Sequence, residues 1–269
     1  MDEYMKNILS KEELSAEKYY QRGNGKLNIG DFKSAIEDFD MAIELNPDYA
    51  EAYGNRGAAK HITGDYKGAK EDYDKAISLN SHYVLAYSNR GWAKHSLGDY
   101  KGAIADYDKA IKLNPSFVDA YNNRGWTKHS FGKHAEAIPD FDRAIKLNPN
   151  FLEAYVNRGW TKHTLGKFNE AIADYDKAIK INPSYSLAYV DRALAKGELR
   201  NYKSAITDYD RAIELNPAYP WSYRNRGNDK CSVGDYRGAI VDFEKAIELE
   251  PSWRDVLQPN INQARLKVR

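Results

Sequence analysis

The chain of 269 residues has a single cysteine, Cys231, and no apolar run near the roughly 18 residues that a membrane-spanning helix needs. One cysteine excludes a disulfide framework and any zinc site built mainly from cysteines. The first twenty residues, MDEYMKNILSKEELSAEKYY, lack the apolar stretch of a secretory signal. We therefore expect a soluble, cytoplasmic protein with no membrane partner.

The chain also lacks an excess of charge of either sign, because 40 Lys and Arg face 39 Asp and Glu and leave a formal charge of +1. That balance excludes a strongly basic nucleic-acid-binding protein by bulk charge alone. The hydrophobic share, 42%, is close to the globular average, so a largely disordered chain is not expected.

Proline is scarce but regularly placed. The dipeptide Asn-Pro recurs at intervals of 34 residues or twice that, at positions 46, 114, 148, 182 and 216, and Asn80-Ser81 and Glu250-Pro251 fill the remaining slots. A fixed period of this length indicates a solenoid of tandem repeats. The pattern divides the chain into seven repeats: 16–49, 50–83, 84–117, 118–151, 152–185, 186–219 and 220–253.

We number the places of each repeat from 1 to 34, starting at Ala16. Place 4 is always Tyr, places 20 and 27 are always Ala, and place 24 is Tyr or Phe. Places 8 and 15 are Gly in six of the seven repeats. In period, small residues, aromatics and closing Pro, residues 16–253 resemble the tetratricopeptide repeat (TPR) family. The resemblance implies an antiparallel helix pair per repeat, stacked into a right-handed superhelix.

The residues predict the same architecture independently. Apolar residues recur at helical spacing over places 1–14 and 17–30, with Gly at place 15 and Pro at place 32 as helix breakers. We expect an all-α, right-handed superhelical α-solenoid of seven stacked helix-turn-helix repeats. Residues 1–15 form an N-terminal cap segment with a capping-box pattern from Ser10 to Glu13, and residues 254–269 form a C-terminal capping helix.

Two local expectations accompany this fold. The residue after the Pro of each repeat is predicted to cap the next first helix, as in Asp48 and Ser116. The sixth repeat lacks both glycines, with Ala193 and Arg200 in their places, and is expected to be irregular.

Charges repeat with the same period. Place 7 is always Arg, place 11 always Lys, place 23 always Asp, and place 25 Asp or Glu. Because basic and acidic members are equal in number, we predict an ionic ladder in which Arg bridges to Asp within or between repeats. A basic stripe that binds a ligand is the alternative.

The resemblance places the binding surface on the inner, concave face, which the first helices line. There, place 6 is mostly Asn, place 9 is Trp in three consecutive repeats, and place 12 is His in four. Exposed Trp side chains are frequent anchors of binding partners, and Asn amides can bond an extended peptide backbone. Recent duplication or mutual packing would also explain this repetition. The candidate peptide-binding residues are Asn55, Asn89, Asn123, Asn157, Trp92, Trp126, Trp160, His95, His129 and His163.

The same face is acidic, with six acids and one base at places 2, 5, 6, 9, 12 and 13. We therefore expect a protein or peptide partner of neutral to basic charge and no nucleic acid. TPR proteins that bind acidic chaperone tails carry Lys near place 5, and none of the seven residues at that place is Lys, so no such tail is expected. Arg224 with Asn225 and Asn228 is the one group suited to a carboxylate.

No catalytic set of residues stands out from the repeat pattern. Helices packed about 8–10 Å apart do not bring His residues of successive repeats onto one zinc ion, so neither a metal nor another cofactor is predicted. The sequence indicates a non-enzymatic scaffold that binds an extended peptide or protein segment in its concave groove. A nucleic-acid-binding helical-repeat protein is the alternative, and self-association remains open.

Overall fold

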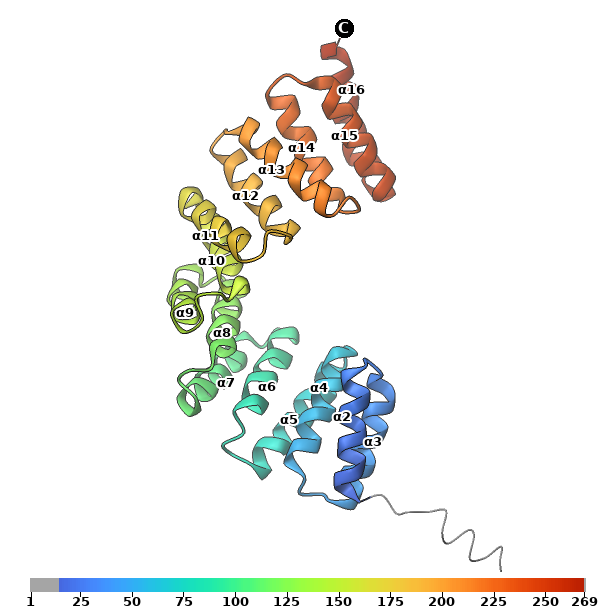
Figure 1. The fold of residues 1–269 in the computed structure, drawn as a ribbon, viewed down its shortest axis with the longest axis vertical. Coiled ribbons are helices and arrows are strands. Elements are labelled where there is room, and N and C mark those ends of the chain that lie inside the picture. Colours follow the sequence, from blue (N-terminus) through green and yellow to red (C-terminus); the bar gives the residue numbers. More distant parts are fainter. Residues whose placement is uncertain (1–14, 269) are drawn as a thin grey trace, which may run out of the picture. The chain divides into compact units, whose positions relative to one another are not determined.

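The structure, a computed structural model, describes residues 15–268, and every regular element in that range is helical (Figure 1). The predicted all-α repeat solenoid is confirmed. The first helices of the repeats are α2 (Ala16–Asn28), α4 (Ala50–Ile62), α6 (Val84–Ser96), α8 (Val118–Ser130), α10 (Leu152–Thr164), α12 (Ser186–Glu198) and α14 (Pro220–Ser232). The second helices are α3 (Phe32–Leu45), α5 (Tyr66–Leu79), α7 (Tyr100–Leu113), α9 (His134–Leu147), α11 (Phe168–Ile181), α13 (Tyr202–Leu215) and α15 (Tyr236–Leu249).

Helix packing divides the chain into two compact units. The first ends at Phe131 and contains α2 to α8, and the second begins at Gly132 and contains α9 to α15 and the C-terminal helix. Within each unit, a first helix packs against the second helix of its own repeat, and that helix packs against the next first helix. A helix inside a unit therefore packs on more than one neighbour, which a single isolated helix pair could not provide.

In a repeat that lies within one unit, the core rests on the close approach of the two helices. A Cβ atom added at Gly57 (place 8) would lie 2.9 Å from the ring of Tyr73 (place 24), which is 1% exposed. The glycine thus leaves the space that the aromatic ring fills. The alanines at places 20 and 27, such as Ala69 and Ala76, are fully buried beside it.

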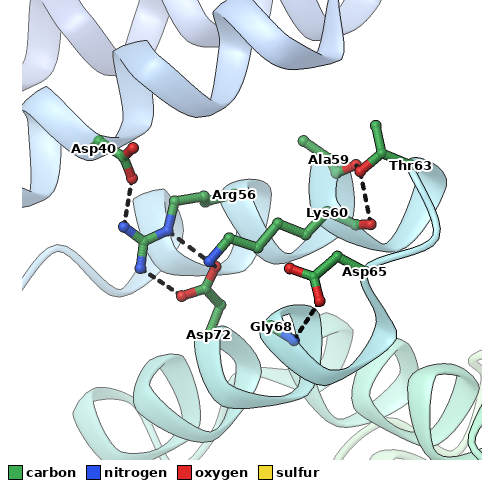
Figure 2. Close-up of polar contacts among 8 residues, drawn as sticks. All are labelled: Asp40, Arg56, Ala59, Lys60, Thr63, Asp65, Gly68 and Asp72. Atoms are coloured by element: carbon green, nitrogen blue, oxygen red, sulfur yellow. Dashed lines mark hydrogen bonds and ion pairs between the residues drawn. The ribbon is translucent and has the colours of Figure 1, made fainter.

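The turn between repeats differs from the prediction. The residue after Pro does not cap the next helix: the N-cap of α4 is Tyr49, which makes no capping bond through its side chain. Instead Asn46 Oδ1 accepts the backbone N–H of Asp48 at 3.2 Å, so the Asn closes the turn and the helix begins one residue later than expected. Apart from the cap of α2, the side-chain caps that form within residues 15–268 belong to second helices, for example Asp65, whose Oδ1 accepts the N–H of Gly68 at 2.9 Å (Figure 2).

The expectation of an irregular sixth repeat is wrong. Its first helix, α12, has 13 residues like the other first helices, because Ala193 is small enough to be fully buried at place 8. The missing glycine at place 15 changes the backbone only locally. Arg200 has φ of 59°, the left-handed conformation that glycine adopts in the other repeats.

The predicted ionic ladder is confirmed, and it runs both within and between repeats. In Figure 2, Nε and Nη2 of Arg56 donate to the two oxygens of Asp72 at 2.9 and 2.5 Å, and Nη1 donates to Asp40 of the preceding repeat at 2.6 Å. Lys60 Nζ lies 2.8 Å from the same Asp72 carboxylate, which is only 4% exposed. The place-7 arginines are therefore framework groups and do not form a stripe open to a ligand.

The C-terminal helix α16 (Arg254–Val268) follows a short 3-10 turn, η1 (Pro251–Trp253), and packs against α15. Leu257, Ile261 and Ala264 are the residues of α16 that are buried, and Leu257 and Ile261 pack with Phe243 of α15. Of the predicted N-terminal segment only Ser15 lies within the described residues, where its Oγ accepts the N–H of Lys18 at 3.2 Å and caps α2. No helix within residues 15–268 is long and apolar enough to cross a membrane.

Candidate functional site

The predicted binding residues lie on the surface formed by successive first helices, which we call the first-helix face and define by places 2, 5, 6, 9, 12 and 13. The helices α2, α4, α6 and α8 contact one another in order in the first unit, as do α10, α12 and α14 in the second. The first unit carries Asn55, Asn89, Trp92, His95, Asn123, Trp126 and His129. The second unit carries Asn157, Trp160, His163, Arg224, Asn225 and Asn228.

Each Trp at place 9 lies flat on the His one turn later. The ring centroids of Trp92 and His95 are 5.3 Å apart with an interplanar angle of 4°. The Trp126–His129 and Trp160–His163 pairs repeat this stacking. Trp92 remains 36% exposed, so this stack presents an aromatic surface to solvent.

The imidazoles are part of the packing. His95 contacts the ring of Tyr100 edge-on, and its Nδ1 lies 3.0 Å from Thr127 Oγ1 on the next first helix. Burial lowers the pKa of His61, His95 and His163 below the ordinary histidine value. The lowered pKa favours the neutral form of these three rings near pH 7.

Two of the Asn side chains form hydrogen bonds within the protein. Asn55 Nδ2 donates to Asn24 Oδ1 at 2.7 Å and to Tyr20 Oη at 3.1 Å, so both of its amide hydrogens are used. Asn123 Oδ1 accepts from Asn122 at 3.3 Å. An extended peptide would meet fewer open amide groups here than the sequence pattern implies.

Pockets open on this face where the repeats differ from one another. Between α4 and α6 a pocket of about 190 Å³ lies beside Ala58, His61, Tyr73, Asn89 and Trp92. Ala58 occupies place 9, where the next three repeats have Trp. The pocket therefore borders a small side chain at a place where the next three repeats carry an indole.

A second pocket in the same register lies between α12 and α14. It measures about 210 Å³, and its lining includes Gly197, Glu198, Asn225, Asn228 and Asp229. Burial raises the pKa of Asp229 to about 6. Asn225 and Asn228 thus share their pocket with carboxyl groups.

Arg224, on the same helix as these two asparagines, lies against an aromatic cluster. Its guanidinium carbon is 4.9 Å from the ring centroid of Trp221 and 5.4 Å from that of Trp253, and the two indoles meet edge-on. Arg224 is not among the residues that line the α12–α14 pocket. The indoles were missed because they fall at places 2 and 34, where the other repeats have no Trp.

The metal-binding and thiol chemistry of the described chain is limited. Residues 15–268 contain no group of three or more His, Cys, Asp or Glu arranged to hold a metal ion. Cys231 lines a pocket of about 340 Å³ between α14 and α16, and burial raises the pKa of its thiol, which makes it a weak nucleophile at neutral pH.

Helix pairs that recur with a period of 34 residues and pack against one another in order define a helical-repeat solenoid. Family models described as tetratricopeptide repeat match residues 16–49, 50–83, 118–151 and 152–185, and a TPR repeat model matches residues 93–130 and 198–229. The chain belongs to the tetratricopeptide repeat family. A comparison with curated proteins found no match.

Solved structures of TPR proteins resemble this chain. A tetratricopeptide repeat protein from Parabacteroides merdae is 21% identical, with 93% of this chain and 98% of that one covered and a TM-score of 0.69. MamA is 28% identical, with 60% and 94% covered and a TM-score of 0.55. YrrB, described as a TPR protein with an unusual peptide-binding site, is 25% identical, with 68% and 95% covered and a TM-score of 0.54.

Proposed function

We propose that this protein is a non-enzymatic interaction scaffold that binds a peptide or an extended protein segment on its first-helix face. TPR repeats support a role in protein interaction at the level of the family. The similarity to YrrB, which is described as having a peptide-binding site, supports the narrower proposal of a peptide ligand.

The α4–α6 pocket is the observation that carries this proposal. Its lining is largely apolar, from Ala58, Ile62 and the aromatic rings of Tyr73 and Trp92, while Asn89 adds a polar side chain at its edge. An apolar cavity with a small number of polar groups is the usual form of a site that anchors one side chain of a ligand. Exposed Trp is also among the residues that contribute most to binding energy.

The charge of the face supports a partner that is neutral to basic. Acidic side chains at its places, including Glu51, Asp119 and Glu153, are exposed to solvent. An acidic surface repels RNA and acidic tails and attracts basic segments at long range.

Panning a library of random peptides against the intact chain tests the proposal. Recovered peptides should bind the parent, and their affinity for Ala58→Trp should be at least tenfold lower. The new indole would fill the pocket, and the neighbouring repeats already accommodate Trp at this place. Trp92→Ala should weaken peptide binding as well, since it removes the wall of the same pocket. Affinities are measured by fluorescence polarisation of labelled peptides.

Val241→Ala is the matched control, because Val241 is 64% exposed on a second helix, away from the first-helix face. It should leave the affinities unchanged. Circular dichroism verifies that all variants are folded. Recovery of no binding peptide, or peptides that bind Ala58→Trp and Trp92→Ala as tightly as the parent, would contradict the proposal.

A further inference from the structure

One contact between consecutive first helices has different residues in the last pair of first helices, α12 and α14. Place 12 of one first helix faces place 10 of the next, as His95 Nδ1 faces Thr127 Oγ1 at 3.0 Å. In five repeats place 10 is Ala or Thr and is fully buried: Ala59, Ala93, Thr127, Thr161 and Ala195. In the seventh repeat this place holds Asp229, while place 12 of the sixth repeat is Gly197.

The two changes occur at the same contact. A Cβ atom added at Gly197 would lie 3.6 Å from both carboxylate oxygens of Asp229, so the glycine directly faces the carboxyl group. The imidazole that repeats two to five have at place 12 is absent here, and a pocket of about 210 Å³ remains. The carboxyl group of Asp229 thus faces Gly197, a residue without a side chain.

One carboxylate oxygen of Asp229 has no hydrogen-bond partner among the described residues. Its Oδ2 is buried and makes no hydrogen bond. A buried carboxylate oxygen without a donor is unfavourable, and a cation or a hydrogen-bond donor from outside would relieve this cost. Burial also raises the pKa of Asp229, because the charged carboxylate loses water without gaining a hydrogen-bond donor at Oδ2.

The other groups around the pocket increase its preference for positive charge. Glu198 of α12 and Tyr209 of α13 line it together with Asp229 of α14, and no Lys or Arg is among the described residues of the lining. The nearby basic side chains Lys196 and Lys230 are each engaged with the place-23 aspartate of their own repeat, at 2.7 and 2.9 Å. Asn225 and Asn228 add amide groups at the rim.

We propose that the pocket between α12 and α14 binds a cationic side chain, Lys or Arg, of a partner segment, with the carboxylate of Asp229 as its counter-ion. Charge-assisted hydrogen bonds from an ammonium or guanidinium group would satisfy Oδ2, and Glu198 would add attraction from the rim. This inference rests on the proposed function, because the cation comes from a segment bound along the first-helix face. It narrows the partner to one that carries a basic residue able to bind on the second unit.

Small cations test the pocket without any knowledge of the partner. N-acetyl-arginine amide and N-acetyl-lysine amide are titrated into the isotopically labelled full chain, with N-acetyl-norleucine amide as an uncharged comparison. The backbone amide signals of Gly197 and Asn228 report binding by NMR. Saturable shifts with the two cations, weaker at high salt, are expected, whereas norleucine amide should produce none.

Three variants locate the binding. Asp229→Asn, which keeps the shape, and Gly197→His, which restores the imidazole of other repeats, should each weaken the cations roughly tenfold or more, a change equal to about 1.4 kcal/mol. Glu153→Gln is the matched control, since it removes an exposed acid on the same face of the same unit and should have no effect.

Equal shifts with norleucine amide, or unchanged cation binding by Asp229→Asn, would overturn the inference. The peptide experiment at the α4–α6 pocket concerns residues of the first unit, whereas these titrations concern the second. A failure here therefore leaves the proposed function intact, and a failure of the peptide experiment leaves the cation result readable.

Discussion

Replacing Asp106 by Asn is expected to destabilise the first unit strongly. This carboxylate is 4% exposed and accepts from Arg90 Nε and Nη2 at 2.9 and 2.5 Å, while Lys94 Nζ lies 2.8 Å away. The side chains of Arg90 and Lys94 are each 16% exposed, so water cannot easily replace the lost partner.

The magnitude follows from the burial of the three groups. Removing one partner of a buried ion pair costs about 3–5 kcal/mol, because the remaining charge stays desolvated. Arg90 keeps one bond to Asp74 at 2.7 Å, which places the expected loss near the lower end, about 3 kcal/mol. That loss corresponds to a roughly hundredfold faster amide hydrogen exchange in α6 and α7 wherever exchange proceeds through unfolding of this pair.

Asp74→Asn is the matched control in the same ladder. Its carboxylate also bonds Arg90 but is 42% exposed, so the change should cost less than about 1 kcal/mol. Urea unfolding followed by circular dichroism gives the free energies, and hydrogen exchange gives their location. Equal midpoints for Asp106→Asn and the parent, or equal losses for the two variants, would refute the reasoning that burial makes this ladder stabilising.

Three further substitutions test other parts of the fold. Gly57→Ala should cost about 1–3 kcal/mol in urea unfolding, because the new Cβ lies 2.9 Å from the Tyr73 ring, whereas Gly25→Ala, with no neighbour within 4 Å, should stabilise by up to about 1 kcal/mol. Arg200→Gly should gain about 1 kcal/mol in thermal unfolding by relieving a positive φ. Burial raises the pKa of Asp191 to about 7, so the parent loses stability as pH rises from about 4 through 7. Asp191→Asn, which introduces the residue usual at place 6, should have a similar stability at pH 4 but be more stable than the parent at pH 8 by about 2–4 kcal/mol. Parallel pH profiles of stability for the two proteins would contradict this.

The sequence predicts the framework well because the framework is what repeats. Gly64 and Gly98 at place 15 end their first helices with positive φ, as a glycine after a helical pattern indicates. The equal numbers of Arg and Asp at fixed places likewise predict the ladder. Each of these features depends on residues within one or two neighbouring repeats, so periodicity is sufficient to find it.

The pockets could not be predicted in this way, because they depend on exceptions to the pattern. Asp229 and Gly197 are 32 residues apart, and only the register between α12 and α14 shows that they face each other. The bonds of Asn55 also depend on exceptions, because its Nδ2 donates to Tyr20 and Asn24, which stand at places 5 and 9 of the preceding first helix. Unusual residues at places 9, 10 and 12 were the signal that could have identified both pockets.

The two-directional bonding of the place-7 arginines has a consequence for the length of the array. Arg192 bonds Asp208 of its own repeat and Asp176 of the repeat before it, and Arg226 makes the same two bonds one repeat later. A whole repeat inserted between two others would supply a carboxylate to its successor and a guanidinium to its predecessor, leaving no charge unmatched. Such arrays can lengthen by duplication of 34 residues without electrostatic cost, whereas an insertion of any other length would separate the charges that now pair.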